Sequence, residues 1–165
     1  MSLFKPTEII NNYLDLDVTN LKNIGIKVLL IDIDNTIALP DRGSLSLDAK
    51  RFINNIKNND IIPVIFSNNN KNRVSNFVDD FEVDWYYYVL KPLPFYFKKI
   101  FKTYNIKANE CAVIGDQLLT DILGANLSGC YGIYSKQLQE KDTPLTKINR
   151  TIEKIIWRFI DDKKM

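Results

Sequence analysis

The stretch Val28-Leu29-Leu30-Ile31-Asp32-Ile33-Asp34-Asn35-Thr36-Ile37 places two aspartates, two residues apart, at the end of an apolar run. Such a run is typical of a parallel strand that is buried on both faces. Open α/β sheets bind their ligands at the carboxyl ends of these strands. Because side chains alternate along a strand, Asp32 and Asp34 can both lean toward one site there. The stretch therefore indicates an α/β fold with two carboxylates at its ligand site, although aspartates are also common in turns and helix caps.

Three later segments repeat this form, in which a strand-like run ends in polar residues. The residues that end them are Ser67-Asn68-Asn69, Lys91-Pro92 and Gly115-Asp116-Gln117-Leu118-Leu119-Thr120-Asp121. Pro92 biases Lys91 toward an extended conformation, which directs its cation to the same edge of the sheet. Four consecutive strand ends therefore offer acids, a hydroxyl with amides, a cation, and acids again.

Strand-like and helical patterns alternate along the chain, and they predict one domain over residues 1–165. Strands are expected at 27–32, 61–66, 85–89, 112–114 and 131–134, and helices at 7–13, 46–58, 71–79, 94–104 and 120–127. This alternation indicates a parallel five-stranded sheet in a three-layer Rossmann-like arrangement. The connections after Thr36 and after Ser67 are too short to hold a cap domain, so we expect an open site.

Composition excludes several classes of chemistry. The chain contains no histidine, which rules out Ser-His-Asp and Cys-His catalysis and histidine-ligated zinc. Its formal net charge is +2 without an extended basic tract, so we expect no nucleic-acid partner. Cys111 and Cys130 lack CxxC spacing and are expected to be buried thiols. With no signal peptide and no apolar stretch of membrane-spanning length, the sequence predicts a cytoplasmic protein.

The order of the four motifs resembles that of the haloacid dehalogenase-like phosphatases. These motifs are DxDxT from Asp32, SN from Ser67, KP from Lys91 and GDxxxxD from Gly115. The likeness is closer still to the YqeG-type family of subclass IIIA, and it covers nearly the whole chain. It rests also on the lead-in from Asp17 to Gly25 and on Thr146-Lys147-Ile148-Asn149-Arg150. The resemblance implies a phosphatase with this family's fold, and the short connections after Thr36 and after Ser67 predict that it has no cap domain.

The resemblance also implies roles for individual residues in a Mg²⁺-dependent phosphomonoester hydrolase. Asp32 would be the nucleophile that forms an aspartyl-phosphate, and Asp34 the general acid and base. Asp32, Asp116 and the backbone carbonyl of Asp34 would hold the metal. The substrate phosphate would be bound by Ser67, Asn68 and Lys91. Further members of the site would be Asp121, Asn35, Thr36, Asn69 and Arg150.

Elementary electrostatics supports a cation at such a site. A carboxylate that attacks a phosphate monoester repels it by about 4 kcal/mol for each pair of unit charges at about 4 Å, with an effective dielectric constant near 20. Mg²⁺ suits an oxygen-only site with few carboxylates. Lys91 would add positive charge near the phosphoryl oxygens, and the Ser67 hydroxyl can donate a hydrogen bond to one of them.

Several candidates also have plain structural interpretations. Lys91 could be a solvated surface charge. The hydroxyl and amide of the second motif could cap the next helix. Asn35 and Asn69 could be turn residues that tolerate unusual dihedral angles. Asp121 ranks below Asp116, because it could contact the metal only through water or simply fix Lys91.

An open site favours a large or surface-bound substrate. Distant relatives by resemblance include mitochondrial phosphatidylglycerophosphate phosphatases, so a lipid phosphate is one candidate, with peripheral contact to an anionic membrane. The connection 38–44 could act as a partial flap or be an ordinary loop. An amphipathic helix is expected at 145–160, packed on the sheet or facing anionic lipid.

The sequence leaves two rival functions open. One is a phosphate- or nucleotide-sensing binding module on the same fold, against which the intact Asp34 argues, since a binder needs no proton shuttle. The other is a phosphomutase, which the missing cap disfavours. The sequence does not fix the oligomeric state or the substrate.

Overall fold

The computed structural model describes residues 3–40, 42–79, 81–139 and 144–161, and within the last range it describes only the backbone of residues 144–150, 159 and 161. Its centre is a six-stranded sheet in the order β1-β6-β5-β2-β3-β4, and every pair of neighbouring strands is parallel. The strands are β1 (Glu8–Ile10), β2 (Val28–Ile31), β3 (Ile62–Phe66), β4 (Asp84–Tyr86), β5 (Cys111–Gly115) and β6 (Tyr131–Ser135). The predicted α/β class with a parallel sheet is confirmed, with one strand more than expected.

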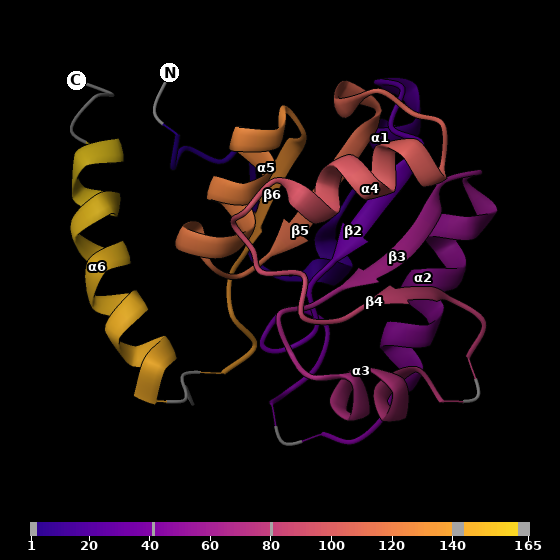
Figure 1. The fold of residues 1–165 in the computed structure, drawn as a ribbon, viewed down its shortest axis with the longest axis horizontal. Helices are drawn as coiled ribbons and strands as arrows, with labels where there is room; N and C mark the ends of the chain where they lie inside the picture. The colour runs from indigo at the N-terminus through magenta and orange to yellow at the C-terminus, as the bar shows by residue number, and fades with distance from the viewer. Residues whose placement is uncertain (1–2, 41, 80, 140–143, 162–165) are drawn as a thin grey trace.

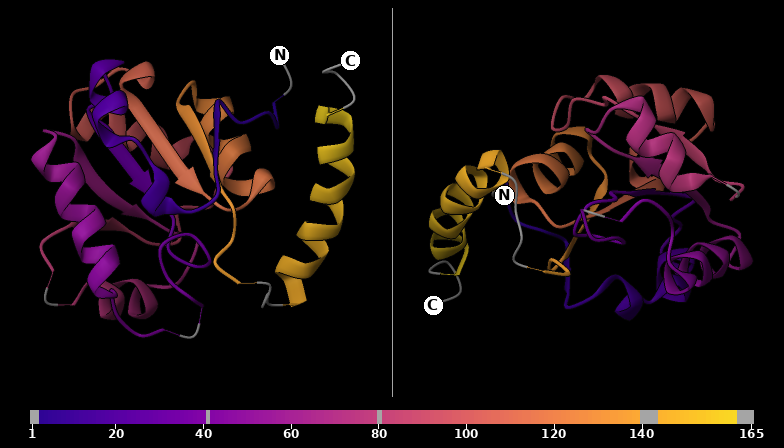
Figure 2. Two further views of the ribbon diagram at one scale, coloured as in Figure 1. Left: turned by 180° about the vertical axis from the view of Figure 1, so that it is seen from behind. Right: turned by 90° about the horizontal axis from the view of Figure 1, so that it is seen from below.

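Helices cover both faces of this sheet (Figures 1 and 2). The α-helices are α1 (Val18–Asn23), α2 (Leu47–Asn58), α3 (Lys71–Val78), α4 (Phe95–Thr103), α5 (Leu123–Ser128) and α6 (Pro144–Asp161). Shorter turns are the 3-10 helices η1 (Tyr13–Asp15) and η2 (Ala108–Glu110) and the π-helix η3 (Leu118–Ile122). These elements form three layers, as the alternating pattern predicted.

Alternate residues of the central strands build two separate cores. Leu29 and Ile31 of β2 belong to a cluster with buried residues of α1, α2 and α3. Val28 and Leu30 belong to a second cluster with Phe97 of α4 and Ala125 of α5. Since neighbouring residues on a strand point to opposite faces, the apolar run needs two cores, and the sheet must be covered on both sides.

The N-terminal segment corrects the expectation of a helix at 7–13. Glu8–Ile10 forms strand β1, which pairs in parallel with β6, and the amide of Thr7 donates to the carbonyl of Gly132 at 2.8 Å. The short helix η1 begins only after Asn12, whose side chain caps it. The edge of β6 offers an unpaired row of backbone groups, and pairing with it outweighs the weak helical signal of so short a segment.

Element ends follow local chemistry elsewhere. Ser46 caps α2, with its hydroxyl accepting a hydrogen bond from the amide of Ala49 at 3.1 Å, and α4 begins directly after Pro94. The strand expected at 85–89 is shorter, because Tyr88 and Leu90 adopt positive φ angles of 45° and 56° that an extended strand does not allow. The helix expected at 120–127 starts earlier, as the π-turn η3, before α5 continues it.

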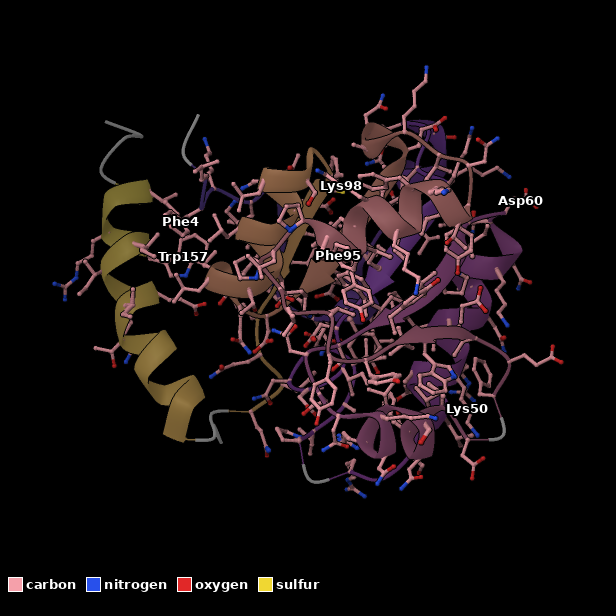
Figure 3. All side chains as sticks on the ribbon, in the orientation of Figure 1. Phe4, Lys50, Asp60, Phe95, Lys98 and Trp157 are labelled. Carbon is pink, nitrogen blue, oxygen red and sulfur yellow. The ribbon has the colours of Figure 1, made fainter. Side chains whose placement is uncertain are left out.

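Helix α6 lies beside the sheet next to α5, at the end that carries β1 and β6 (Figures 1 and 2). Its residues Ile156, Trp157 and Ile160 pack with Phe4, Leu118, Ile122 and Tyr134, and Figure 3 labels Phe4 and Trp157 at this contact. The amide of Leu119 also donates to the buried Glu153 carboxylate at 3.1 Å. The expected amphipathic helix is therefore present, and its apolar residues pack against η3 and against Tyr134 of β6.

The two cysteines and the lengths of the helices bear on two expectations from composition. Cys111 and Cys130 are both free thiols and both buried, as predicted. Within the described residues, every helix is too short or too polar to cross a bilayer.

Candidate active site

Three adjacent strands bring the first, second and fourth motifs together. Ile31, the last residue of β2, is in register with Ile65 of β3 and Ile114 of β5. The residues that follow these strands therefore leave the sheet at one edge, at its carboxyl end. Asp32, Ser67 and Asp116 all lie there, and all three are buried.

Lys91 joins this group from the segment after β4. Its Nζ atom lies 2.6 Å from Oδ1 of Asp32, 2.7 Å from Oδ1 of Asp121 and 2.9 Å from the carbonyl oxygen of Phe66. The residue is only 6% exposed, so the interpretation of Lys91 as a solvated surface charge is wrong. Burial favours the neutral amine, but the carboxylates of Asp121 and Asp32 outweigh it and raise the pKa of Lys91. The ammonium group is therefore retained inside the site.

The side chain of Asn68 holds Lys91 in place through its backbone. Its Oδ1 atom accepts a hydrogen bond from the Lys91 amide at 2.7 Å, and its Nδ2 atom donates to the Lys91 carbonyl at 3.1 Å. Asn68 was expected to bind the substrate phosphate, whereas in this structure its amide group is engaged with the lysine segment. It fixes the direction from which the cation enters the site.

Phosphate binding and helix capping, the two roles considered for the second motif, would fall to different residues, Ser67 and Asn70. The Ser67 hydroxyl accepts a hydrogen bond from the amide of Asn69 at 3.1 Å, which leaves its own proton available to a substrate oxygen. Helix α3 is capped by Asn70, which accepts from the amide of Arg73 at 2.9 Å. The interpretation of Ser67 and Asn68 as caps of this helix is therefore wrong.

Three buried carboxylates lie close together in the site. One oxygen each of Asp32, Asp116 and Asp121 lie within 4.8 Å of one another. Lys91 is the cation that bridges two of them. Burying this much negative charge is costly unless cations offset it, and an oxygen-only donor set of this kind suits a divalent ion such as Mg²⁺. The residues present therefore fit the metal that the motif pattern implies.

The electrostatics of Asp32 reflects this crowding. Burial raises the pKa of its carboxyl to about 7, the charge of Lys91 acts to lower it, and the charges of Asp121 and Asp34 raise it further. Without a metal ion, the protein thus disfavours the ionised form of Asp32. A cation bound beside Asp32 would favour the ionised form.

Gly115 makes the approach of Asp121 possible. A Cβ atom at position 115 would lie 2.2 to 2.5 Å from three atoms of the Asp121 side chain, a separation far below van der Waals contact. The amide of Gln117 then donates to Oδ2 of Asp121 at 3.1 Å. Both oxygens of Asp121 are therefore engaged, one by Lys91 and one by the backbone, which agrees with the lower rank given to it as a metal ligand.

Thr36 and Asn35 support the first motif. The fully buried Thr36 hydroxyl lies 3.4 Å from Oδ2 of Asp32 and 3.4 Å from Oδ1 of Asp116. It can donate its single proton to one of them. Asn35 adopts a left-handed φ of 62°, and its amide donates to the carbonyl of Ala38 at 2.7 Å. This geometry agrees with the interpretation of Asn35 as a turn residue.

Asp34 has different partners from Asp32. The Nδ2 atom of Asn69 donates to its Oδ2 atom, and an NH₂ nitrogen of Arg73 lies 2.7 Å from its Oδ1 atom. The Asp34 side chain is 27% exposed, against 11% for that of Asp32. The two aspartates of one motif therefore occupy separate environments, and Asn69 does more than turn the chain.

Sequence reasoning missed Arg73. It lies in the first turn of α3, four residues after Asn69. This spacing of about one helical turn is the signal that would have identified it. Residues spaced by about one turn share a helix face, and the start of this helix faces the motif edge. By contrast, the side chain of Arg150 and all of Asp41 in the predicted flap lie outside the described residues.

Comparisons with known proteins agree with this geometry. A family model described as haloacid dehalogenase-like hydrolase matches residues 5–129, and the chain belongs to this family. It is 32% identical over 153 residues to a protein of Bacillus subtilis (strain 168) named probable phosphatase YqeG. That match covers 93% of this chain and 89% of the relative. The chain is thus a phosphatase of the YqeG type.

Two solved structures share the fold at lower identity. An uncharacterized protein from Listeria monocytogenes serotype 4b has a TM-score of 0.56 at 18% identity, over 72% of this chain and 85% of its own. The cobalt-bound form of the deoxy-D-mannose-octulosonate 8-phosphate phosphatase from Haemophilus influenzae has a TM-score of 0.53 at 16% identity, over 69% and 70%. At these identities, the likeness concerns the fold.

Proposed function

We propose that this protein is a Mg²⁺-dependent phosphomonoester hydrolase that works through an aspartyl-phosphate on Asp32. The observation that carries the proposal is the division between the two aspartates of the first motif. Asp32 is buried against Lys91, whereas Asp34 is turned toward Asn69 and Arg73 and is partly exposed. Carboxyl groups in contrasting environments are typical of sites where one acts as nucleophile and the other as acid and base.

The first half of the reaction transfers the phosphoryl group. An oxygen of Asp32 forms a bond to phosphorus, and the bond from phosphorus to the ester oxygen breaks. Protonated Asp34 gives its proton to that oxygen, so the product leaves as a neutral alcohol. Lys91 offsets negative charge beside Asp32, and the Ser67 hydroxyl donates to a phosphoryl oxygen.

The second half regenerates Asp32. Asp34, now ionised, takes a proton from a water molecule whose oxygen attacks phosphorus, and the bond from phosphorus to Asp32 breaks. Inorganic phosphate leaves, and Asp34 is protonated again for the next cycle. Asp34 is suited to both halves because its side chain reaches solvent.

Asp32, Asp116 and the backbone carbonyl of Asp34 would hold the Mg²⁺ ion, and Asp121 would hold Lys91. The ion would supply positive charge that offsets the repulsion between Asp32 and the phosphate dianion. The Thr36 hydroxyl lies 3.4 Å from one oxygen of Asp32 and 3.4 Å from one oxygen of Asp116, and it would orient the carboxylate to which it donates.

We further propose an open site that acts on a large or surface-bound phosphate ester. Within the described residues, only α2 and β3 separate Asp34 from Ser67, and only α3 and β4 separate Ser67 from Lys91. All four elements belong to the sheet and its helical layers. The described part of the chain therefore contains no inserted cap over this edge.

The surface beside Lys91 supports a lipid phosphate as one such substrate. Tyr88, Leu90, Leu93 and Phe95 are all exposed, with Phe95 at 72%, and Figure 3 labels Phe95 and Lys98 on α4. Residues 85–109 contain lysines but no acidic residue. Exposed aromatic and aliphatic side chains flanked by lysines suit the surface of an anionic bilayer.

A phosphate-release assay tests this proposal. The substrates would be an aryl phosphate, a soluble alkyl phosphate and phosphatidylglycerophosphate in vesicles, each with and without Mg²⁺. We expect Mg²⁺-dependent release from all three and none from Asp32→Asn, with the fastest release from the lipid. Beryllium fluoride with Mg²⁺ should block the wild type as a phosphoryl mimic. Wild-type rates in Asp32→Asn would contradict the covalent route, and slow release from the lipid alone would remove only the substrate assignment.

The same assay addresses the rival functions. A binding module would retain phosphate esters without releasing phosphate. A phosphomutase would move the phosphoryl group within its substrate without net release, and rapid phosphate formation would argue against it.

A further inference from the structure

Arg73 is fixed in the site by contacts on several sides. One NH₂ nitrogen lies 2.7 Å from Oδ1 of Asp34, and the other donates to the carbonyl oxygen of Arg42. The guanidinium carbon lies 5.3 Å from the centre of the Phe77 ring, which is fully buried one helical turn further along α3. The backbone amide of Arg73 is bound by the Asn70 cap. A side chain with these contacts has little freedom left to lose in the transition state.

Arg73 and Asn69 each bind one oxygen of the Asp34 carboxylate. Asn69 donates to Oδ2 and Arg73 donates to Oδ1, so the plane of the carboxyl group is fixed by donors at both oxygens. A carboxyl group keeps acceptor sites when it is protonated, and the two contacts can therefore persist in both halves of the reaction. A charged donor with planar geometry orients an acceptor more strongly than a neutral one.

The contact with Arg42 adds a second connection. Arg42 belongs to the connection between β2 and α2, and its carbonyl accepts from the same guanidinium that holds Asp34. Arg73 therefore links the acid and base to the loop that borders the open edge of the site. The orientation of Asp34 and the position of the loop at Arg42 therefore both depend on the Arg73 side chain.

We infer that Arg73 is a positioning residue of this enzyme: it orients Asp34 for proton transfer and ties it to the loop at Arg42. This inference rests on the proposed role of Asp34. Arg73 acts through Asp34 and need not touch the substrate. Its contribution is therefore confined to the steps in which Asp34 moves a proton.

The leaving group provides a readout that a general structural role would not affect. An alkyl oxygen needs a proton as it departs, whereas the oxygen of an aryl phosphate with an acidic phenol departs readily without one. We expect Arg73→Ala to lower kcat/KM for an alkyl phosphate by about tenfold or more, and for an activated aryl phosphate by less than about threefold. Arg73→Lys, which retains the charge but not the planar pair of donors, should recover part of the loss.

A double-mutant cycle tests whether Arg73 acts through Asp34. In an Asp34→Asn background, Arg73→Ala should cost almost nothing further, because there is no acid left to orient. Arg51→Ala is the matched control, since Arg51 is an exposed arginine on α2 that pairs with Asp48, and it should leave all rates unchanged. Circular dichroism and thermal unfolding would establish that each variant is folded.

The outcomes separate the two levels of the proposal. Equal losses from Arg73→Ala in both backgrounds would show an independent contact and overturn the inference, as would equal losses on alkyl and aryl substrates. If Asp34→Asn retains full activity on the alkyl phosphate, the proposed acid and base is wrong. If Asp34→Asn is impaired and Arg73→Ala is not, only the role of Arg73 is refuted.

Discussion

The Nζ atom of Lys91 lies 2.6 Å from Oδ1 of Asp32, although the two residues are 59 positions apart in the sequence. Both side chains are buried, and the same ammonium group also lies 2.7 Å from Asp121. The cation thus holds two of the three clustered carboxylates together. Lys91 therefore stabilises the site, and its ammonium group lies beside the proposed nucleophile.

Removing this ammonium group should destabilise the protein. We expect Lys91→Met to lower the free energy of unfolding of the metal-free protein by about 3 to 5 kcal/mol, the usual cost of breaking a buried ion pair on one side. Urea unfolding would measure it. Mg²⁺ should recover part of the loss, because a second cation can offset the exposed repulsion among the carboxylates. A loss below about 1 kcal/mol would match a surface ion pair instead.

The two acids of the fourth motif should respond differently to mutation. Asp121 already uses one oxygen for Lys91 and the other for the Gln117 amide. We therefore expect Asp116→Ala to raise the Mg²⁺ concentration needed for half-maximal rate by more than about a hundredfold, because it removes a direct ligand and the loss of an outer-shell partner alone already costs about 10- to 100-fold. Asp121→Ala should change this concentration much less and should mainly lower stability. Titration of rate against Mg²⁺ would compare them, and an equal shift would place Asp121 among the direct ligands.

Gly115 should not tolerate a methyl group. In Gly115→Ala, the Asp121 carboxylate must move away from the new Cβ atom, and its contact with Lys91 is then lost or lengthened. We expect a large fall in kcat and a lower melting temperature. Gly43→Ala is a suitable control, because a Cβ atom there meets nothing within 4 Å. A Gly115→Ala variant with wild-type kcat would show that Asp121 can move without consequence.

The metal-free protein should lose stability as pH rises through the range set by Asp32. Its pKa is raised from 3.8 to about 7 in the folded state. Between about pH 4 and 7, Asp32 therefore loses its proton in the unfolded chain but keeps it in the folded protein. The contribution is therefore complete below pH 4 and lost as pH rises toward 7, by a few kcal/mol at most. Subtracting the unfolding free energy of the Asp32→Asn variant from that of the wild type at each pH cancels the contribution of the other carboxyl groups. A flat difference would contradict the raised pKa, and saturating Mg²⁺ should weaken the trend.

Much of the scaffold could be predicted from local pattern. The apolar runs before Asp32, Ser67 and Asp116 are buried strands, because continuous apolar surface can be buried only between two layers. Ser46 and Pro94 mark the starts of α2 and α4 through their own backbone and side-chain chemistry. Parallel strands then force the residues that follow them to one edge, so the meeting of the motifs followed from the sequence.

Only the tertiary structure decided the remaining relationships, because they depend on partners that are distant in the chain. Strand β1 exists because β6 offers it an edge, and this outweighs its own weak propensity. Lys91 is buried because Asp32 and Asp121 hold its charge. In the sequence, Arg73 has the pattern of an ordinary surface arginine, and only the folded structure places it against Asp34. Hydrophobic periodicity is a local signal and fixes the strands and helices, whereas the pairing of charges requires the folded chain, since only there are distant groups close enough to stabilise one another.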